Sequence, residues 1–185
     1  YQWGRKYGQG YSESYDESVP ELVEGPVMPS VAQSEENKDK FYYASQSPYD
    51  WSKVQNDNMW NSGTEENPVK TEYDPCPEGW RVPTYAELDE LNNNYSSWTT
   101  DDNGQSGRWF SGPNSYTASV PQVFFPAAGF RYNNDGYAYY RGSRGYYWSS
   151  RPFSNYAFSL YFFSSSVLMY DYYRAGGYSV RCVQE

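Results

Sequence analysis

The chain has 185 residues, a formal net charge of −9 and no histidine, and 21% of its residues are aromatic, with 23 Tyr among them. The absence of histidine excludes Ser-His-Asp and Cys-His catalysis and histidine-based zinc sites, and the acidic balance argues against nucleic-acid binding. So aromatic a chain is expected to fold, its length fits a single domain over residues 1–185, and no apolar run is long enough for a membrane span.

The N-terminal part is expected to consist mostly of loops. Residues 7–40 are polar, acidic and interrupted by prolines. We predict a long surface excursion here, ordered only where Val27, Met28 and Val31 meet hydrophobic neighbours. A short helix between residues 43 and 58 is an open alternative. Four tryptophans in loops or rigid phrases are expected to plug the core: Trp51, Trp60, Trp80 and Trp148.

The clearest helix signal covers residues 85–91. Thr84 is a suitable N-cap, and Glu87 three residues later completes a capping box. Leu88 and Leu91, spaced three apart, predict the buried stripe of this helix.

From residue 98 onward the pattern changes to short strands and turns. Asp101–Gly104 begins like a calcium loop, but the later carboxylates are missing, so a polar turn is favoured. Four runs are expected to form strands: 122–131, 146–150, 157–162 and 178–183. Alternation in the third run places Phe158 on the same face as Leu160.

The two cysteines, Cys76 and Cys182, allow two interpretations. A disulfide between them would close a long loop and stabilise the fold by roughly 4–5 kcal/mol. The alternative is a pair of buried free thiols in a cytosolic protein. The Tyr-, Ser- and Asn-rich, Lys-poor second half favours an exported protein and therefore the disulfide. No signal peptide is visible, so we expect that a leader, and upstream domains with it, have been removed.

Five phrases in chain order resemble the bacterial FISUMP-type major paralogous domain: YQWGRK, KTEYDPCPEGWRVPT, FFPAAGFR, GYYWSS and SVRCV. This resemblance implies an α+β, C-type-lectin-like fold with short antiparallel strands, one or two helices and long loops. It also implies a Cys76–Cys182 disulfide, terminal strands that lie together, and an extracellular, bacterial cell-surface or phage-particle location. The fold is shared with formylglycine-generating enzymes, but their catalytic cysteine pair has no counterpart if both cysteines form the bridge.

Residues 146–183 resemble the variable region of proteins that are diversified by retroelements, in which scattered surface positions vary on a fixed C-type-lectin-like frame. The resemblance implies thirteen variable, ligand-binding positions: Arg151, Phe153, Asn155, Tyr156, Phe158, Tyr161, Phe163, Ser166, Leu168, Tyr170, Asp171, Tyr172 and Tyr173. An outward Phe158 conflicts with simple strand alternation, and a β-bulge would reconcile the two.

These features predict a non-enzymatic protein that binds a macromolecular ligand, protein or glycan, without cofactor or metal. Tyr offers wide contact area at low entropic cost, with a polar tip, as it does in antibody loops. Residues 170–173 are expected to form an exposed patch on a loop, with Asp171 pairing with a cation of the partner, unless the tyrosines only cover the sheet. The alternatives are a structural or adhesive surface module and a sugar-processing enzyme, for which no carboxylate pair stands out.

Overall fold

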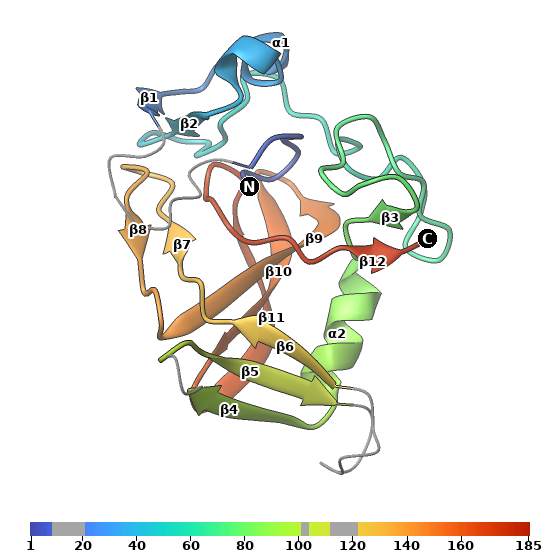
Figure 1. Ribbon diagram of the computed structural model, residues 1–185. Helices are drawn as coiled ribbons and strands as arrows, with labels where there is room; N and C mark the ends of the chain where they lie inside the picture. Colours follow the sequence, from blue (N-terminus) through green and yellow to red (C-terminus); the bar gives the residue numbers. More distant parts are fainter. Residues whose placement is uncertain (9–20, 101–103, 112–121) are drawn as a thin grey trace.

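The computed structural model describes residues 1–8, 21–100, 104–111 and 122–185. Short strands, mostly antiparallel, and two α-helices make the fold α+β (Figure 1). Helices are α1 (Pro29–Ala32) and α2 (Tyr85–Asn93), with a 3-10 turn, η1 (Glu35–Asn37). Strands are β1 (Glu21–Glu24), β2 (Lys40–Tyr43), β3 (Trp80–Arg81), β4 (Ser96–Thr100), β5 (Ser106–Ser111), β6 (Gln122–Pro126), β7 (Phe130–Arg131), β8 (Ala138–Tyr139), β9 (Arg144–Phe153), β10 (Tyr156–Phe163), β11 (Ser166–Tyr173) and β12 (Val183–Gln184).

A three-stranded antiparallel sheet in the order β11-β10-β9 lies at the centre of the fold. On one side of this sheet, Tyr146, Trp148 and Ala157 join a core cluster with tryptophans from the N-terminal half. On the other side, Leu160 and Phe162 pack with Leu88 of α2 and with the sheet β4-β5-β6. The central sheet is therefore covered on both faces, but by different parts of the chain.

Helix α2 confirms the capping prediction. The Thr84 side chain accepts a hydrogen bond from the Glu87 N–H, and the Glu87 carboxylate accepts one from the Thr84 N–H. Leu88 is buried and Leu91 packs partly against the same cluster. The predicted bounds were short by two residues, because the helix continues to Asn93.

Part of the predicted surface excursion is ordered, contrary to expectation. Strand β1 pairs in parallel with β2, and α1 and η1 lie between them, whereas residues 9–20 lie outside the described part. The buried guanidinium of Arg5 donates hydrogen bonds to the carbonyls of Ala32, Asn37 and Lys40 and thereby orders this segment. Val27 packs against the core as predicted, but the exposed side chains of Met28 and Val31 do not.

The predicted strand over residues 122–131 is two strands, β6 and β7. Gly129 separates them with a φ of 71°, and a Cβ at this position would lie 2.2 Å from the Tyr139 carbonyl oxygen. Such a close approach of two backbones requires glycine. The small residues Ala127, Ala128 and Gly129 therefore mark the break between β6 and β7.

A disulfide joins Cys76 to Cys182, which confirms the interpretation that the Tyr-, Ser- and Asn-rich, Lys-poor second half of the sequence favoured. The buried carboxylate of Asp74 holds the connector in place, accepting hydrogen bonds from the Cys76 N–H, the Val82 N–H and Lys70 Nζ. Among the four predicted core tryptophans, three are buried, but Trp80 is 43% exposed because it lies on β3, which pairs only with β12.

The first residues of the chain lie beside residues 177 and 178, near its C-terminal end. Gln2 forms a β-bridge with Gly177, and the Tyr178 N–H donates to the Tyr1 carbonyl. The predicted last strand, 178–183, is shorter than expected: β12 begins at Val183, after a single bridge from Ser179.

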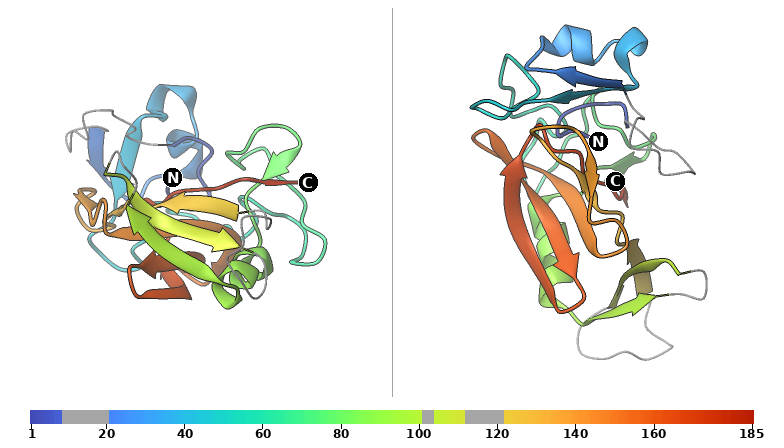
Figure 2. Two further views of the ribbon diagram at one scale, coloured as in Figure 1. Left: turned by 60° about the horizontal axis from the view of Figure 1, so that its bottom comes forward. Right: turned by 90° about the vertical axis from the view of Figure 1, so that its left-hand side faces the viewer.

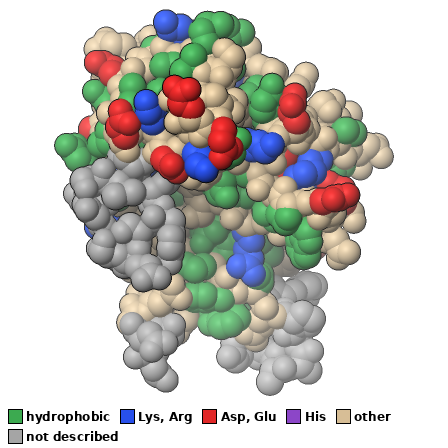
Figure 3. All heavy atoms as spheres, turned by 45° about the horizontal axis from the view of Figure 1, so that its top comes forward, with side chains coloured by type: hydrophobic (Ala, Val, Ile, Leu, Met, Phe, Trp, Pro, Cys, Tyr) green, Lys and Arg blue, Asp and Glu red, His purple; other side chains and the backbone are tan. Residues whose placement is uncertain are grey.

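Charged side chains of both signs alternate over the upper part of the face in Figure 3 and are sparser below.

Candidate functional site

All thirteen predicted ligand-binding positions reach the surface to some degree. Each is exposed or half-buried, and Phe153 and Tyr170 are the most open of the large rings, at 57% and 51%. The residues between them are closed: every residue from 145 to 150 is buried, as are Ala157, Leu160 and Phe162. Strands β9 to β11 thus combine an immobile frame with accessible side chains.

The register of the sheet divides these positions between two opposite faces. Directly paired residues of an antiparallel sheet share a face, and neighbours along a strand alternate. Residues on the side of α2 are Arg151, Phe153, Tyr156, Phe158, Asp171 and Tyr173; we call this the helix face. Residues on the other side are Tyr161, Phe163, Ser166, Leu168, Tyr170 and Tyr172; we call this the tyrosine face. Asn155 lies in the turn between β9 and β10, where its side chain donates to the Pro48 carbonyl.

The tyrosine face is an array of rings in mutual contact. The Tyr172 ring lies 5.1 Å from that of Tyr170, 6.3 Å from that of Tyr161 and 5.5 Å from that of buried Tyr146. Burial raises the pKa of Tyr146 to about 12 and also raises that of Tyr172, so both phenols are neutral at physiological pH. The array offers polar hydroxyls on a preorganised apolar base.

The β7–β8 hairpin extends this face beyond the predicted positions. Arg144 lies 3.8 Å above the Tyr140 ring and pairs with Phe163 across the sheet. Tyr139 and Tyr140 are 40% and 48% exposed. These two residues are not among the thirteen predicted positions, although three tyrosines within four residues, 137–140, were a visible signal in the sequence.

The helix face is built on Phe158, whose ring contacts both Phe153 and Tyr85. The Arg151 guanidinium lies 5.1 Å above Tyr85 and 5.5 Å from the Phe158 ring centre, an arrangement typical of cation–π contacts. Tyr85 was missed, although it precedes Leu88 by three residues and so belongs to the helix stripe that faces the sheet.

A stacked tyrosine pair continues the helix face. The rings of Tyr156 and Tyr173 lie 4.4 Å apart, and their hydroxyls are 3.0 Å apart. Tyr49 packs against Tyr173 at 4.5 Å. Tyr49 comes from a distant loop and has a φ of 58°, so nothing in the sequence pattern could assign it to this surface.

Two expectations about these strands meet different outcomes. Residues 170–173 were predicted on a loop, but they form the end of β11, so Asp171 and Tyr173 face away from Tyr170 and Tyr172. The pairing of β10 with β9 does shift between Ala157 and Ser159, but the extra residues lie in β9 and the shift does not turn Phe158 to the other face. Phe158 lies on the same side of the sheet as Leu160, as simple alternation predicts, and is half-buried beside Tyr85.

Arg174 fixes the end of β11 to the turn between β9 and β10. Its buried guanidinium donates to the carbonyls of Tyr156, Ser154 and Asn56 and to the Asp57 carboxylate. It also lies 4.5 Å from the ring centre of Trp3. This one cation therefore holds together three segments that carry the helix face.

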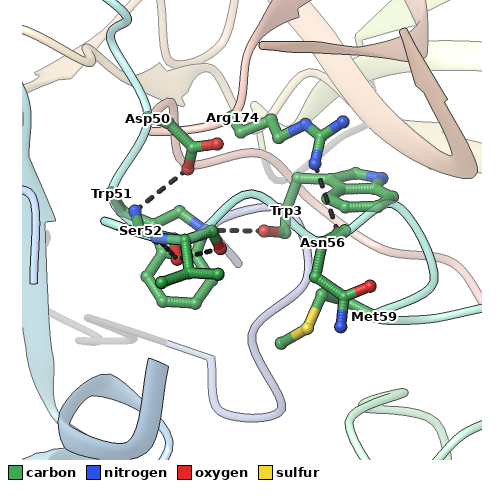
Figure 4. Close-up of a pocket in the computed structure, with 8 residues that line it drawn as sticks. Trp3, Asp50, Trp51, Ser52, Asn56, Met59 and Arg174 are labelled. Atoms are coloured by element: carbon green, nitrogen blue, oxygen red, sulfur yellow. Dashed lines mark hydrogen bonds between the residues drawn. The ribbon is translucent and has the colours of Figure 1, made fainter. Parts of the chain in front are cut away.

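A small pocket, with room for about one water molecule, is lined in part by Arg174 (Figure 4). Trp3, Trp51 and Met59 form its apolar walls, and the Asp50 carboxylate accepts a hydrogen bond from the Ser52 N–H. Burial raises the pKa of Asp50. The polar side chains of the pocket thus bond to the backbone of the surrounding segments.

No group of three or more Cys, Asp or Glu side chains in the described ranges is placed to hold a metal ion, and the turn at 101–103 falls outside those ranges. No helix among the described residues has the length and apolar character needed to span a bilayer.

A family model described as a domain of unknown function, DUF8237, matches residues 86–183. The match begins in α2, ends at the start of β12, and contains all thirteen positions. No curated protein and no solved structure matches the chain.

Proposed function

The chain belongs to the DUF8237 family, whose model covers more than half of its 185 residues, and we propose that it is a non-enzymatic binding protein. The aromatic side chains of β9 to β11 contact a macromolecular ligand, while the buried residues between them hold the backbone fixed. The scaffold is of the C-type-lectin type, and the thirteen positions are those that vary between copies of the gene.

The observation that carries this proposal is that buried residues and accessible residues are interleaved along the same strands. In β10, Ala157, Ser159, Leu160 and Phe162 have no exposed surface, while Phe158, Tyr161 and Phe163 between them do. Side chains that are not part of the core can change without loss of packing, whereas core side chains cannot. Rigid rings also lose little conformational entropy on binding, as in antibody paratopes.

The disulfide agrees with a protein that acts outside the cytosol, on a bacterial cell or on a phage particle. The alternative function is a structural or adhesive surface module without variable positions. In that case the same rings would serve one constant partner. Sequence variation at the locus discriminates between the two.

The first test is to sequence this locus across a natural population. Substitutions are expected to concentrate at the thirteen positions, with a reverse-transcriptase gene and a near-copy of the terminal coding segment nearby. Variation spread evenly over the surface, without the near-copy, would support the constant module instead.

The second test displays two libraries of the chain on yeast. One library randomises the thirteen positions, and the matched library randomises buried frame positions such as Tyr147, Ser149 and Leu160. We expect the first library to keep protease-resistant folding and to yield binders to an arbitrary protein target, and the second to lose folding. Failure of the first library to fold or to yield any binder would refute the binding proposal.

A further inference from the structure

The free edge of β11 connects the two faces, since β11 is the outermost strand in the order β11-β10-β9. In Figure 2, right, it lies at the rim of the molecule. A partner that touches both faces at once must therefore pass over this edge. This inference rests on the proposed function and concerns how the ligand is bound.

The pairing of β10 with β11 shows which backbone groups point outward. Phe163 and Ser166 flank a two-residue turn, and the pair that closes such a hairpin is hydrogen-bonded. Pairs then alternate, so Ser166, Leu168, Tyr170 and Tyr172 bond to β10. The N–H and C=O groups of the residues between them, Val167, Met169, Asp171 and Tyr173, point away from the sheet.

Three of these outward residues have backbone groups that no described residue pairs with. The Tyr173 carbonyl accepts a hydrogen bond from Gly176, 2.9 Å away. No residue of the described ranges bonds to the backbone of Val167, Met169 or Asp171. Three N–H donors and three C=O acceptors therefore form a row along the edge.

This edge lacks the features that usually prevent strand addition. Exposed edges are commonly protected by Lys, Pro or a bulge. Strand β11 contains neither Lys nor Pro, its eight residues pair with β10 in unbroken register, and Asp171 is its single charged residue. An edge of this kind is a template for another strand.

The chemistry on the two sides of the edge differs. Leu168, Tyr170 and Tyr172 line it on the tyrosine face. On the helix face, Asp171 has no ion-pair partner among the described residues, and α2, which covers that face, carries acidic side chains and no Lys or Arg. The cation of the helix face, Arg151, lies over the rings of Tyr85 and Phe158. Side chains of an added strand would alternate between these two environments.

We propose that the edge of β11 binds an extended segment of a partner protein in which apolar or aromatic residues alternate with Lys or Arg. The apolar residues lie against Tyr170 and Leu168, and the cations lie beside Asp171. A second copy of this chain is a poorer occupant, because each copy carries a net charge of −9 and the two would repel.

The test uses a fluorescent peptide as long as β11, eight residues, in which Arg alternates with Val or Tyr, and measures binding by anisotropy. Two isomers carry N-methyl groups, one on the Arg amides and the other on the apolar amides. Whether the peptide binds parallel or antiparallel to β11, only one of the two sets of amides points toward the edge of β11. We expect methylation of that set to weaken binding about tenfold or more and methylation of the other set to have little effect.

Two controls complete the test. Asp171→Asn is expected to weaken binding of the Arg peptide but not of a peptide with Gln in place of Arg, whereas Asp39→Asn, on the distant N-terminal part, leaves both unchanged. Absence of binding, equal effects of the two methylation patterns, or a dimer of the free protein in sedimentation would overturn the proposal. If the display library still yields binders, only the edge inference fails and the proposed function stands.

Discussion

At the scale of single residues, buried Arg side chains organise the binding surface. Arg174 is 2% exposed and bonds to three carbonyl oxygens and one carboxylate from two segments, residues 56–57 and residues 154–156. A guanidinium can satisfy so many acceptors because it presents five donors in a fixed plane. Lysine has the same charge but neither the planar fork nor the ability to stack on Trp3.

We therefore expect Arg174→Lys to lower the free energy of unfolding by about 2–4 kcal/mol, because a buried ammonium in its place cannot reach all four acceptors. Urea denaturation followed by Trp fluorescence measures the change. Arg181→Lys is the matched control, since the exposed Arg181 makes one hydrogen bond among the described residues, to the Phe124 carbonyl, and lies over the Phe125 ring. Equal stability of the two variants would show that the contacts of Arg174 contribute nothing beyond its charge.

Residue-scale features differ in how far the sequence predicts them. The capping box needs only Thr84 and Glu87 at the right spacing, and it is present as predicted. The role of Arg5 depends on carbonyls more than 25 residues away, between Ala32 and Lys40, so no local pattern announces it. The same is true of Tyr49 on the helix face.

At the scale of elements, the β10–β11 hairpin carries most of the thirteen predicted ligand-binding positions. Its tip is held from outside by Arg108 of β5, whose buried guanidinium donates to the carbonyls of Phe163 and Ser164 and to the Ser96 hydroxyl. A hairpin alone is marginally stable in water. The second sheet thus fixes the position of the tyrosine face through this contact.

Replacing Arg108 by Met should keep much of the side-chain volume and remove all of these hydrogen bonds. We expect faster amide hydrogen exchange at residues 163–168 and little change in α2, because the helix does not contact this tip through Arg108. Replacing Ser96 by Ala, which removes one acceptor only, is the milder comparison. Unchanged amide hydrogen exchange at residues 163–168 in the Arg108→Met variant would show that Arg108 does not stabilise the tip of the hairpin.

Strand faces were predictable only where the alternation is regular. The buried side of β10 follows from alternation at Leu160 and Phe162, and Phe158 lies on the same side, but the shift in the pairing of β10 with β9 does not follow from the sequence. Nor does the sequence show that residues 170–173 continue a strand, because four bulky polar residues in a row are equally typical of a loop. The division of the thirteen positions between the two faces thus depends on the register in which the strands pair.

At the scale of the whole molecule, the disulfide closes a segment with a sequence separation of 106 residues. In the chain-entropy model, closing a loop of this size stabilises the fold by roughly 4–5 kcal/mol. We expect a variant with Cys76→Ser and Cys182→Ser to lose stability by about this amount, measured by thermal unfolding. The wild-type protein under reducing conditions should show the same loss, and an unchanged unfolding midpoint in both would contradict the prediction.

The loop closed by this bond contains α2, both three-stranded sheets and every display position, whereas residues 1–75 lie outside it. A single proteolytic cut anywhere between the two cysteines would therefore not separate the pieces. The fragments would travel together on a non-reducing gel and part only after reduction. A protein exposed to proteases outside a cell could be nicked once in this region and still keep both halves of its recognition surface on one covalent body.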